Sequence, residues 1–130
     1  MVPAAQGEGM AKNELSERLM QYALRVTRLV RTLPKDIAGE VFGKQLLRCA
    51  SSVAANYRSA CRGKSKADFL SKLKTCQEEA DEAEFWLEMI SESGLVKSGL
   101  LADLKREAWE VTAIITQGCK TTARNIRSEK

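Results

Sequence analysis

The 130-residue sequence contains no histidine. Histidine is the commonest side chain in general acid–base catalysis and a frequent metal ligand, so its absence excludes most catalytic triads and histidine-bound zinc sites. Proline is also rare: only Pro3 and Pro34 occur, and the chain beyond Pro34 has none. Long stretches without proline favour long helices. Strand-like alternation with turn dipeptides is missing as well, which argues against a β-sheet fold.

Further absences narrow the class of protein. No apolar run reaches about 18 residues, so we expect no membrane-spanning segment. The first residues lack the basic and apolar regions of a secretory signal, so we expect a cytoplasmic protein. The four cysteines, Cys49, Cys61, Cys76 and Cys119, include no C-x-x-C pair. Each lies among apolar positions of helical spacing, which predicts buried, reduced thiols and no bound metal or other cofactor.

The length and composition are typical of a single globular domain. Hydrophobic residues make up 44% of the chain and charged residues 29%. We expect residues 1–11 to form a flexible N-terminal extension and residues 12–130 to form the folded domain. The net charge of +4 is mild. It permits binding to an anionic polymer without requiring it.

Apolar residues recur at steps of three and four along four stretches, which is the spacing of amphipathic helices. We expect these helices over residues 13–32, 36–62, 66–93 and 99–125. The clearest apolar seam, in the third stretch, consists of Phe69, Leu73, Cys76, Ala80, Ala83, Leu87 and Ile90. Short links between four long helices favour antiparallel neighbours. The predicted fold of this domain is therefore an all-α, up-down-up-down antiparallel four-helix bundle.

Local signals predict how the helices begin, end and face. Ser65 is the expected N-cap of the third helix. Gly63 is expected to end the second helix in the left-handed conformation, and Gly94 is expected to end the third helix. The second helix is expected to turn one apolar stripe to the core: Val41, Phe42, Leu46, Cys49, Val53 and Tyr57. Three arginines of the first helix are expected on the side opposite its apolar stripe: Arg18, Arg25 and Arg28.

A polar stripe lies beside the apolar stripe of the second helix and consists of Gln45, Arg48, Ser52 and Asn56. On the third helix, Glu79 and Glu82 adjoin the apolar seam. A half-buried arginine between helices needs a carboxylate, so we expect Arg48 to pair with Glu79 or Glu82. The six residues are predicted to form a structural network that sets the register of the helices. A functional site is the alternative, but no nucleophile, base or ligand set accompanies the stripe.

Charge is separated into two consecutive blocks. Arg58 to Lys74 holds six basic residues and one acidic residue, whereas Thr75 to Glu92 holds seven acidic residues and no basic one. The basic block surrounds the turn between the second and third helices, where it is predicted to bind nucleic-acid phosphates without reading bases. Solubilising charge is the alternative. The candidate contacts are Arg58, Arg62, Lys64, Lys66, Lys72 and Lys74, with Arg25, Arg28 and Arg31 as second choices. No aromatic platform accompanies the block, which argues against base stacking there.

The acidic block invites comparison with di-iron bundles. It contains Glu78, Glu79, Asp81, Glu82 and Glu84. The chain has no histidine and its first and fourth helices offer no matching carboxylates, so a solvated face or a contact with a neighbouring subunit's basic face is the better interpretation. Phe85 and Trp86 flank the seam residue Leu87, so at least one should reach the bundle edge. Large aromatics there indicate a subunit interface, with a partly exposed flank as the alternative.

Two strings taken together resemble a known family. Residues 45–58 resemble its Gln-Leu-x-Arg-Ala-x-x-Ser-x-x-x-Asn pattern, and residues 66–87 resemble its third helix. The chain is similar to the bacterial four-helix-bundle proteins encoded in intervening sequences of 23S ribosomal RNA genes. More distantly, it is similar to the accessory variability determinant proteins of diversity-generating retroelements. The resemblance covers roughly residues 13–125.

The resemblance implies a four-helix bundle that assembles as a ring-like homopentamer. In the retroelement relatives it further implies a basic surface that binds nucleic acid and a reverse transcriptase partner. The chain departs from the family pattern after Asn56, because Ser59 stands about where an acidic residue is common. The turn is therefore more basic than usual, which favours anion binding.

These observations lead to one hypothesis and one alternative. The first is a non-enzymatic, homo-oligomeric four-helix-bundle protein that binds RNA or DNA through backbone phosphates. The alternative is a protein-interaction adaptor, whose acidic third-helix surface docks a basic partner such as a reverse transcriptase. Neither hypothesis requires a cofactor, a metal or catalytic residues.

Overall fold

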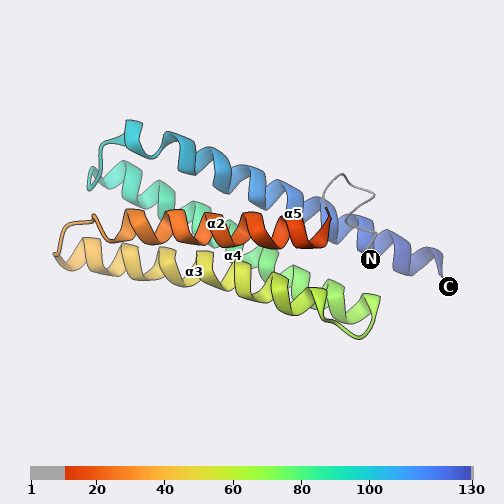
Figure 1. Cartoon of the computed structure of the whole chain (residues 1–130). Coiled ribbons are helices and arrows are strands. Elements are labelled where there is room, and N and C mark those ends of the chain that lie inside the picture. The colour runs from red at the N-terminus through yellow and green to blue at the C-terminus, as the bar shows by residue number, and fades with distance from the viewer. Residues whose placement is uncertain (1–10, 130) are drawn as a thin grey trace.

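The computed structural model describes residues 11–129, which form four long α-helices, one short 3-10 helix and no strand (Figure 1). The helices are α2 (Lys12–Val30), α3 (Ile37–Cys61), α4 (Lys66–Ser93), the 3-10 helix η1 (Ser98–Leu100) and α5 (Ala102–Ser128). The predicted all-α fold is therefore confirmed. The expected flexible extension lies outside the described residues except for Ala11, which is the N-cap of α2.

Contacts between neighbouring helices show that they run antiparallel. Along α3 and α4, Phe42 packs against Trp86 with ring centroids 5.8 Å apart, whereas Tyr57 packs against Phe69 at 6.4 Å. The residue numbers on α4 fall as those on α3 rise, as they must when two helices run in opposite directions. α5 returns along α4 in the same way, since Lys66 at the start of α4 pairs with Glu129 just after α5. The up-down-up-down bundle is confirmed (Figure 1).

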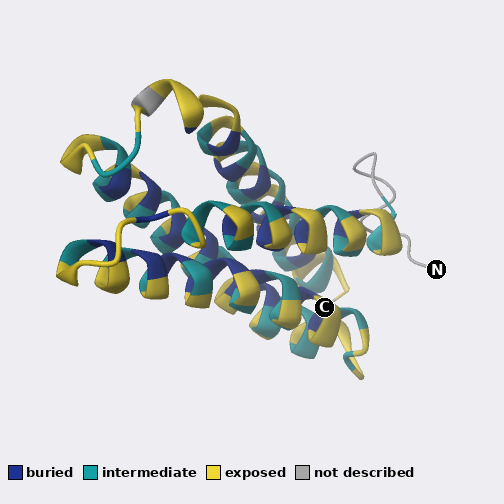
Figure 2. Cartoon of the chain, turned by 60° about the vertical axis from the view of Figure 1, so that its left-hand side comes forward, coloured by how far each residue is buried: buried dark blue, intermediate teal, exposed yellow. Residues whose placement is uncertain are grey.

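The core lies along the seam predicted for α4. Leu73, Cys76, Ala80, Ala83, Leu87 and Ile90 are all buried. Burying such a continuous apolar stripe is the main source of stability in a helix bundle. Phe69 is the exception at the end of the seam, because it is only half-buried and lies under the Lys12 ammonium, 4.4 Å from its ring centroid. Figure 2 shows the buried residues facing inward and the exposed ones facing solvent.

Two positions are less buried than their spacing indicates. Val41 is exposed, because its neighbour Phe42 takes the position against Trp86 in the α3–α4 groove. All four cysteines are free thiols, and three are buried, but Cys61 is only half-buried because it is the last residue of α3.

Among the described residues no helix is both long and apolar enough to span a membrane.

The helix ends follow the predicted signals with one correction. The Ser65 hydroxyl accepts a hydrogen bond from the Asp68 N–H at 3.0 Å, and Gly94 ends α4 in the left-handed region with φ 78°. Gly63 does not adopt a left-handed conformation. Its N–H instead bonds the Ala60 carbonyl at 2.9 Å, and a Cβ at this position would lie 2.9 Å from an Asp68 carboxylate oxygen. Gly63 is therefore needed for space in the α3–α4 turn and not for its φ angle.

The link between α2 and α3 is tighter than expected. α2 ends at Val30, two residues earlier than predicted, and Leu33 still reaches the core from the loop. Close packing here depends on glycine. A Cβ on Gly39 would lie 2.0 Å from the Pro34 carbonyl oxygen, and one on Gly43 would lie 3.0 Å from Leu33 Cδ1.

Candidate functional site

The basic residues predicted to contact phosphates gather at one end of the bundle. Arg58, Arg62, Lys64, Lys66 and Lys74 are exposed, and Lys72 is half-buried. The last turns of α5 lie at the same end and add three exposed basic residues, Lys120, Arg124 and Arg127 (Figure 1). These nine residues define the basic end. The α5 contribution depends on the antiparallel return of that helix, which brings residues far apart in sequence to the α3–α4 turn.

Few carboxylates neutralise the basic end. Lys66 pairs with Glu129, and Lys72 pairs with Asp68 at 3.3 Å. Asp68 also accepts a hydrogen bond from the Lys64 backbone N–H at 3.2 Å. That bond, together with the Lys72 ammonium, lowers the pKa of Asp68. Across residues 11–129, the other seven basic residues of this end make no ion pair.

The second-choice arginines lie elsewhere. Arg28 and Arg31 are exposed and Arg25 is half-buried, near the α2–α3 link at the opposite end of the molecule. The structure therefore does not bring them together with the α3–α4 turn. An array of unpaired cations at one end can hold phosphates electrostatically, and nothing in its geometry reads base edges.

The predicted polar network is present as two separate groups. Arg48 donates to Glu79 at 3.2 Å and to Glu82 at 2.8 Å, and its Nε donates to Gln45 at 3.2 Å. The second group is local to α3. There the Asn56 side-chain amide donates to the Ser52 hydroxyl at 2.8 Å and to the Ser52 carbonyl at 2.9 Å. We place the first group across the α3–α4 groove, where it joins the two helices.

Arg48 is more exposed than its position in the stripe indicates. Its side chain retains 47% of its accessible surface, whereas that of Glu79 retains 21%. The guanidinium therefore lies over the outer edge of the groove and reaches down to both carboxylates. The Trp86 indole N–H also donates to Glu82 at 3.0 Å. That bond, and then the Arg48 bond, lower the pKa of Glu82.

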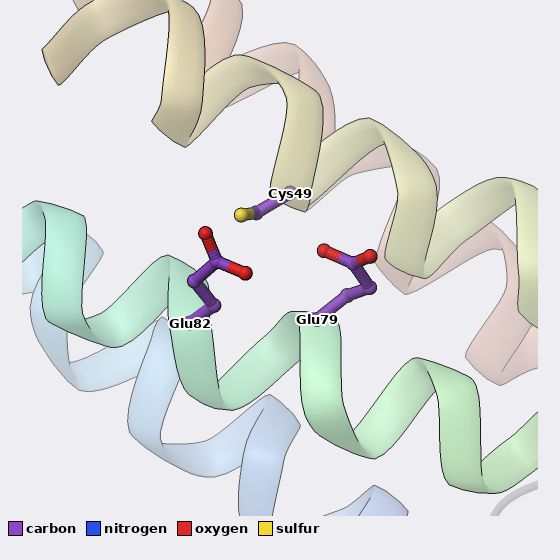
Figure 3. A group of neighbouring side chains, drawn as sticks. All are labelled: Cys49, Glu79 and Glu82. Carbon is purple, nitrogen blue, oxygen red and sulfur yellow. The ribbon is translucent and has the colours of Figure 1, made fainter.

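The same groove holds a cluster of potential metal ligands. The Sγ of Cys49 and carboxylate oxygens of Glu79 and Glu82 all lie within 4.8 Å of one another (Figure 3). The residues do not suit a divalent ion, because Arg48 already bonds both carboxylates and places its Nη2 3.3 Å from the sulfur. Burial, followed by the nearby Glu82 charge, raises the pKa of Cys49 to about 12. Cysteine binds a metal ion as the thiolate, so this thiol is a poor ligand near neutral pH.

One polar contact was missed by the sequence analysis. Arg18 was expected to face solvent, but it donates to Glu107 through two bonds and to Glu110 through a third at 2.7 Å. Glu107 and Glu110 are three residues apart on α5 and so share one face of that helix. Their spacing was visible in the sequence, but their partner is 89 and 92 residues away.

Exposed large apolar side chains avoid the basic end. Among the described residues they are Met20, Leu24, Ile37, Val41, Phe85, Leu100 and Trp109. None lies in the basic block or in α5 beyond Trp109. Phe85 is 52% exposed and contacts Trp86, which is half-buried, so Phe85 is the residue of the pair at the bundle edge. The two ends of the molecule therefore differ in chemistry.

Known proteins share both the sequence pattern and the fold. A family model described as 23S rRNA-intervening sequence protein matches residues 11–117. A crystal structure of a protein of unknown function from the S23 ribosomal protein family of Bacteroides thetaiotaomicron is similar, with a TM-score of 0.78 and 28% identity over 85% of this chain and 99% of that chain. No curated protein matches the chain. Because the family model spans the polar groove, the basic turn and much of α5, the chain belongs to the 23S rRNA-intervening sequence protein family.

Proposed function

We propose that this protein is a non-enzymatic, homo-oligomeric module that binds RNA or DNA through backbone phosphates at its basic end. The observation that carries the proposal is the set of basic residues without ion pairs among the described residues: Arg58, Arg62, Lys64, Lys74, Lys120, Arg124 and Arg127. Three helices, α3, α4 and α5, and the α3–α4 turn contribute to this set. Cations that lack intramolecular carboxylates remain free to displace the counterions of a polyanion, which drives binding.

Self-association, which is part of the proposal, would strengthen binding. The exposed apolar residues lie away from the basic end, with Ile37 and Leu100 near the opposite end and Phe85 on the flank of α4. Burying Ile37, Phe85 and Leu100 between subunits would leave each basic end free. Several basic ends on one assembly would bind one polyanion together, and avidity then converts weak sites into useful affinity. Following the family resemblance, we expect a pentamer.

The oligomer is tested by its mass in solution. Light scattering at micromolar concentration and moderate salt should give several times the mass of one chain. Phe85→Ser combined with Val41→Ser should shift this mass toward the monomer while the circular dichroism spectrum stays helical. A wild-type mass equal to one chain contradicts the oligomer.

The nucleic-acid proposal is tested with two triple variants of equal charge change. Replacing Arg62, Lys64 and Lys66 by Ala removes three cations from the basic end. The control replaces Arg28, Arg31 and Lys35, which are exposed near the α2–α3 link. Fluorescence anisotropy should show at least about tenfold weaker binding to both duplex DNA and structured RNA for the first variant only. Equal loss in the two variants would indicate a diffuse charge effect without a site.

The adaptor remains a second candidate because of one feature of α4. Its outermost residues follow steps of three and four and are all exposed: Glu78, Asp81, Phe85, Glu88 and Glu92. Four carboxylates around one exposed aromatic suit a basic segment that also carries an apolar side chain, such as one from a reverse transcriptase. Glu78→Lys with Asp81→Lys should abolish capture of such a partner and leave nucleic-acid affinity intact. If the variant still captures the partner but loses affinity for nucleic acid, the acidic face of α4 is not the docking site.

A further inference from the structure

The outward face of α5 combines one exposed tryptophan with a row of cations. The Trp109 side chain is 65% exposed. At 3.6 residues per turn, four basic residues lie within about 60° of it around the helix axis. They are Arg106, Lys120, Arg124 and Arg127, and all are exposed. α5 extends past the beginning of α2 (Figure 1), and Lys120, Arg124 and Arg127 in its last turns belong to the basic end.

The carboxylates near this row already take part in ion pairs. The acidic residues of α5 and its C-cap each make an ion pair: Asp103 with Arg106, Glu107 and Glu110 with Arg18, and Glu129 with Lys66. Glu88, on the α4 flank, pairs with Lys105 at 3.5 Å. The Asp103–Arg106 pair is exposed on both sides, so it is weak and can open when a phosphate competes. The excess positive charge of the row therefore lies in its C-terminal half, where Lys120, Arg124 and Arg127 make no ion pair among the described residues.

Within residues 11–129, Trp109 makes no aromatic packing contact or hydrogen bond that would require a side chain of its size. Trp86, for comparison, packs between Phe42 and Phe85 and donates its indole N–H to Glu82. Among the described residues, Trp109 makes no such ring contact and no side-chain hydrogen bond. Its neighbours one turn away on the same face include Ala113, and Ala102 lies two turns away. Because the side chain is 65% exposed, its ring is accessible to a flat partner.

We propose that a single-stranded nucleic acid lies along this face of α5, with one unpaired base stacked on Trp109 and its phosphates bound by Lys120, Arg124 and Arg127. The inference rests on the proposed function and extends it from phosphate contact alone to contact with a base. Stacking needs an accessible base face, which a single strand offers and an intact duplex does not. Trp109 and Arg127 are separated by 18 residues of helix, or about 27 Å, which several nucleotides can span.

The test uses the two tryptophans as separate reporters. In a Trp86→Phe variant, all tryptophan emission comes from Trp109, and in a Trp109→Phe variant it comes from Trp86. Each variant is titrated with a single strand of about 15 thymidines. Emission of the Trp86→Phe variant should be quenched at saturation, because a stacked base quenches the indole, and emission of the Trp109→Phe variant should change little.

Affinity gives the second readout. Trp109→Ala should weaken binding of the thymidine strand by about tenfold, Trp109→Phe should weaken it less, and binding of a duplex of equal length should be unchanged. Thermal melting followed by circular dichroism controls for folding.

The outcomes distinguish this inference from the proposed function. If the strand binds with no quenching of Trp109 and equal affinity in Trp109→Ala, stacking is wrong and the phosphate-binding function stands. If neither strand nor duplex binds the wild type, both are wrong. If Trp109→Ala instead lowers the mass of the assembly, this face is a contact between subunits and the inference is overturned.

Discussion

Arg18 on α2 and Glu107 on α5 are joined by two parallel hydrogen bonds, from Nε to Oε2 at 2.9 Å and from Nη2 to Oε1 at 2.8 Å. These bonds, together with the one bond to Glu110, raise the pKa of Arg18 above its ordinary value. Among the pairs of neighbouring long helices, α2 and α5 make the least extensive contact. The bidentate pair therefore has a large share in closing the bundle between its first and last helices.

Arg18→Ala should lower the free energy of unfolding by about 2 kcal/mol, because it removes charge-assisted bonds and leaves two carboxylates without their partner. Urea denaturation provides the measurement. Arg28→Ala is the matched control, since Arg28 is an exposed arginine of the same helix and makes no ion pair among the described residues. It should stay within about 0.5 kcal/mol of wild type. Equal effects of the two changes would contradict a specific role for Arg18.

Gly39→Ala should destabilise the protein by about 2 kcal/mol, because the added Cβ would stand 2.0 Å from the Pro34 carbonyl oxygen and force the α2–α3 link apart. Gly99→Ala makes the same chemical change where no atom lies within 4 Å. That control should leave the melting temperature unchanged. A Gly39→Ala protein that melts with wild type would show that the link adapts without cost.

Acid should lower the stability of the protein by protonating Glu82 in the α3–α4 groove. The Trp86 indole and then Arg48 lower the pKa of Glu82 below the ordinary 4.5. A group with a depressed folded pKa stabilises the fold above the unfolded value, and this contribution disappears as the pH falls through the folded value. Wild type should therefore be more stable than Glu82→Gln at pH 7, and the difference should vanish well below pH 4.5. A difference that persists in acid would mean that the lost contact is not electrostatic.

Thiol reactivity should separate Cys61 from the other cysteines. Burial raises the pKa of Cys49 and of Cys76 each to about 12, so both stay protonated at pH 8. Cys61 is half-buried at the end of α3. Iodoacetamide at pH 8 should alkylate one site at least about tenfold faster than the rest, and mass spectrometry should identify it as Cys61. The fast alkylation should be absent in Cys61→Ser. In denaturant, all four thiols of the wild type should react fast.

Binding of nucleic acid should depend steeply on salt. Each phosphate neutralised on duplex DNA contributes about −0.9 to the slope of log affinity against log salt concentration. Replacing Arg62, Lys64 and Lys66 by Ala should therefore flatten the slope by up to about 2.7. Affinities for unrelated sequences should fall alike, because these contacts do not read bases. An unchanged slope in the triple variant would show that the α3–α4 turn is a solvated surface.

The bundle itself was predictable from local patterns. Steps of three and four placed Leu73, Cys76, Ala80 and Leu87 on one seam, and all are buried. Ser65 and Gly94 marked the helix ends correctly because capping depends on residues within one turn. Gly63 was predicted wrongly, since a Cβ there would crowd the Ala60 carbonyl and the Asp68 carboxylate, whereas its own backbone angle is ordinary.

The sequence by itself determined four amphipathic helices, their buried stripes and two blocks of opposite charge, because periodicity and charge are properties of each segment alone. The tertiary structure decided which segments meet: Arg18 with Glu107, and the last turns of α5 with the α3–α4 turn. Periodicity shows which face of a helix is apolar, but not how far two helices slide and rotate against each other. Interdigitation of side chains across the whole core sets that register. Register in turn determines which charges are paired and which, such as Lys120 and Arg124, remain free of ion pairs among the described residues.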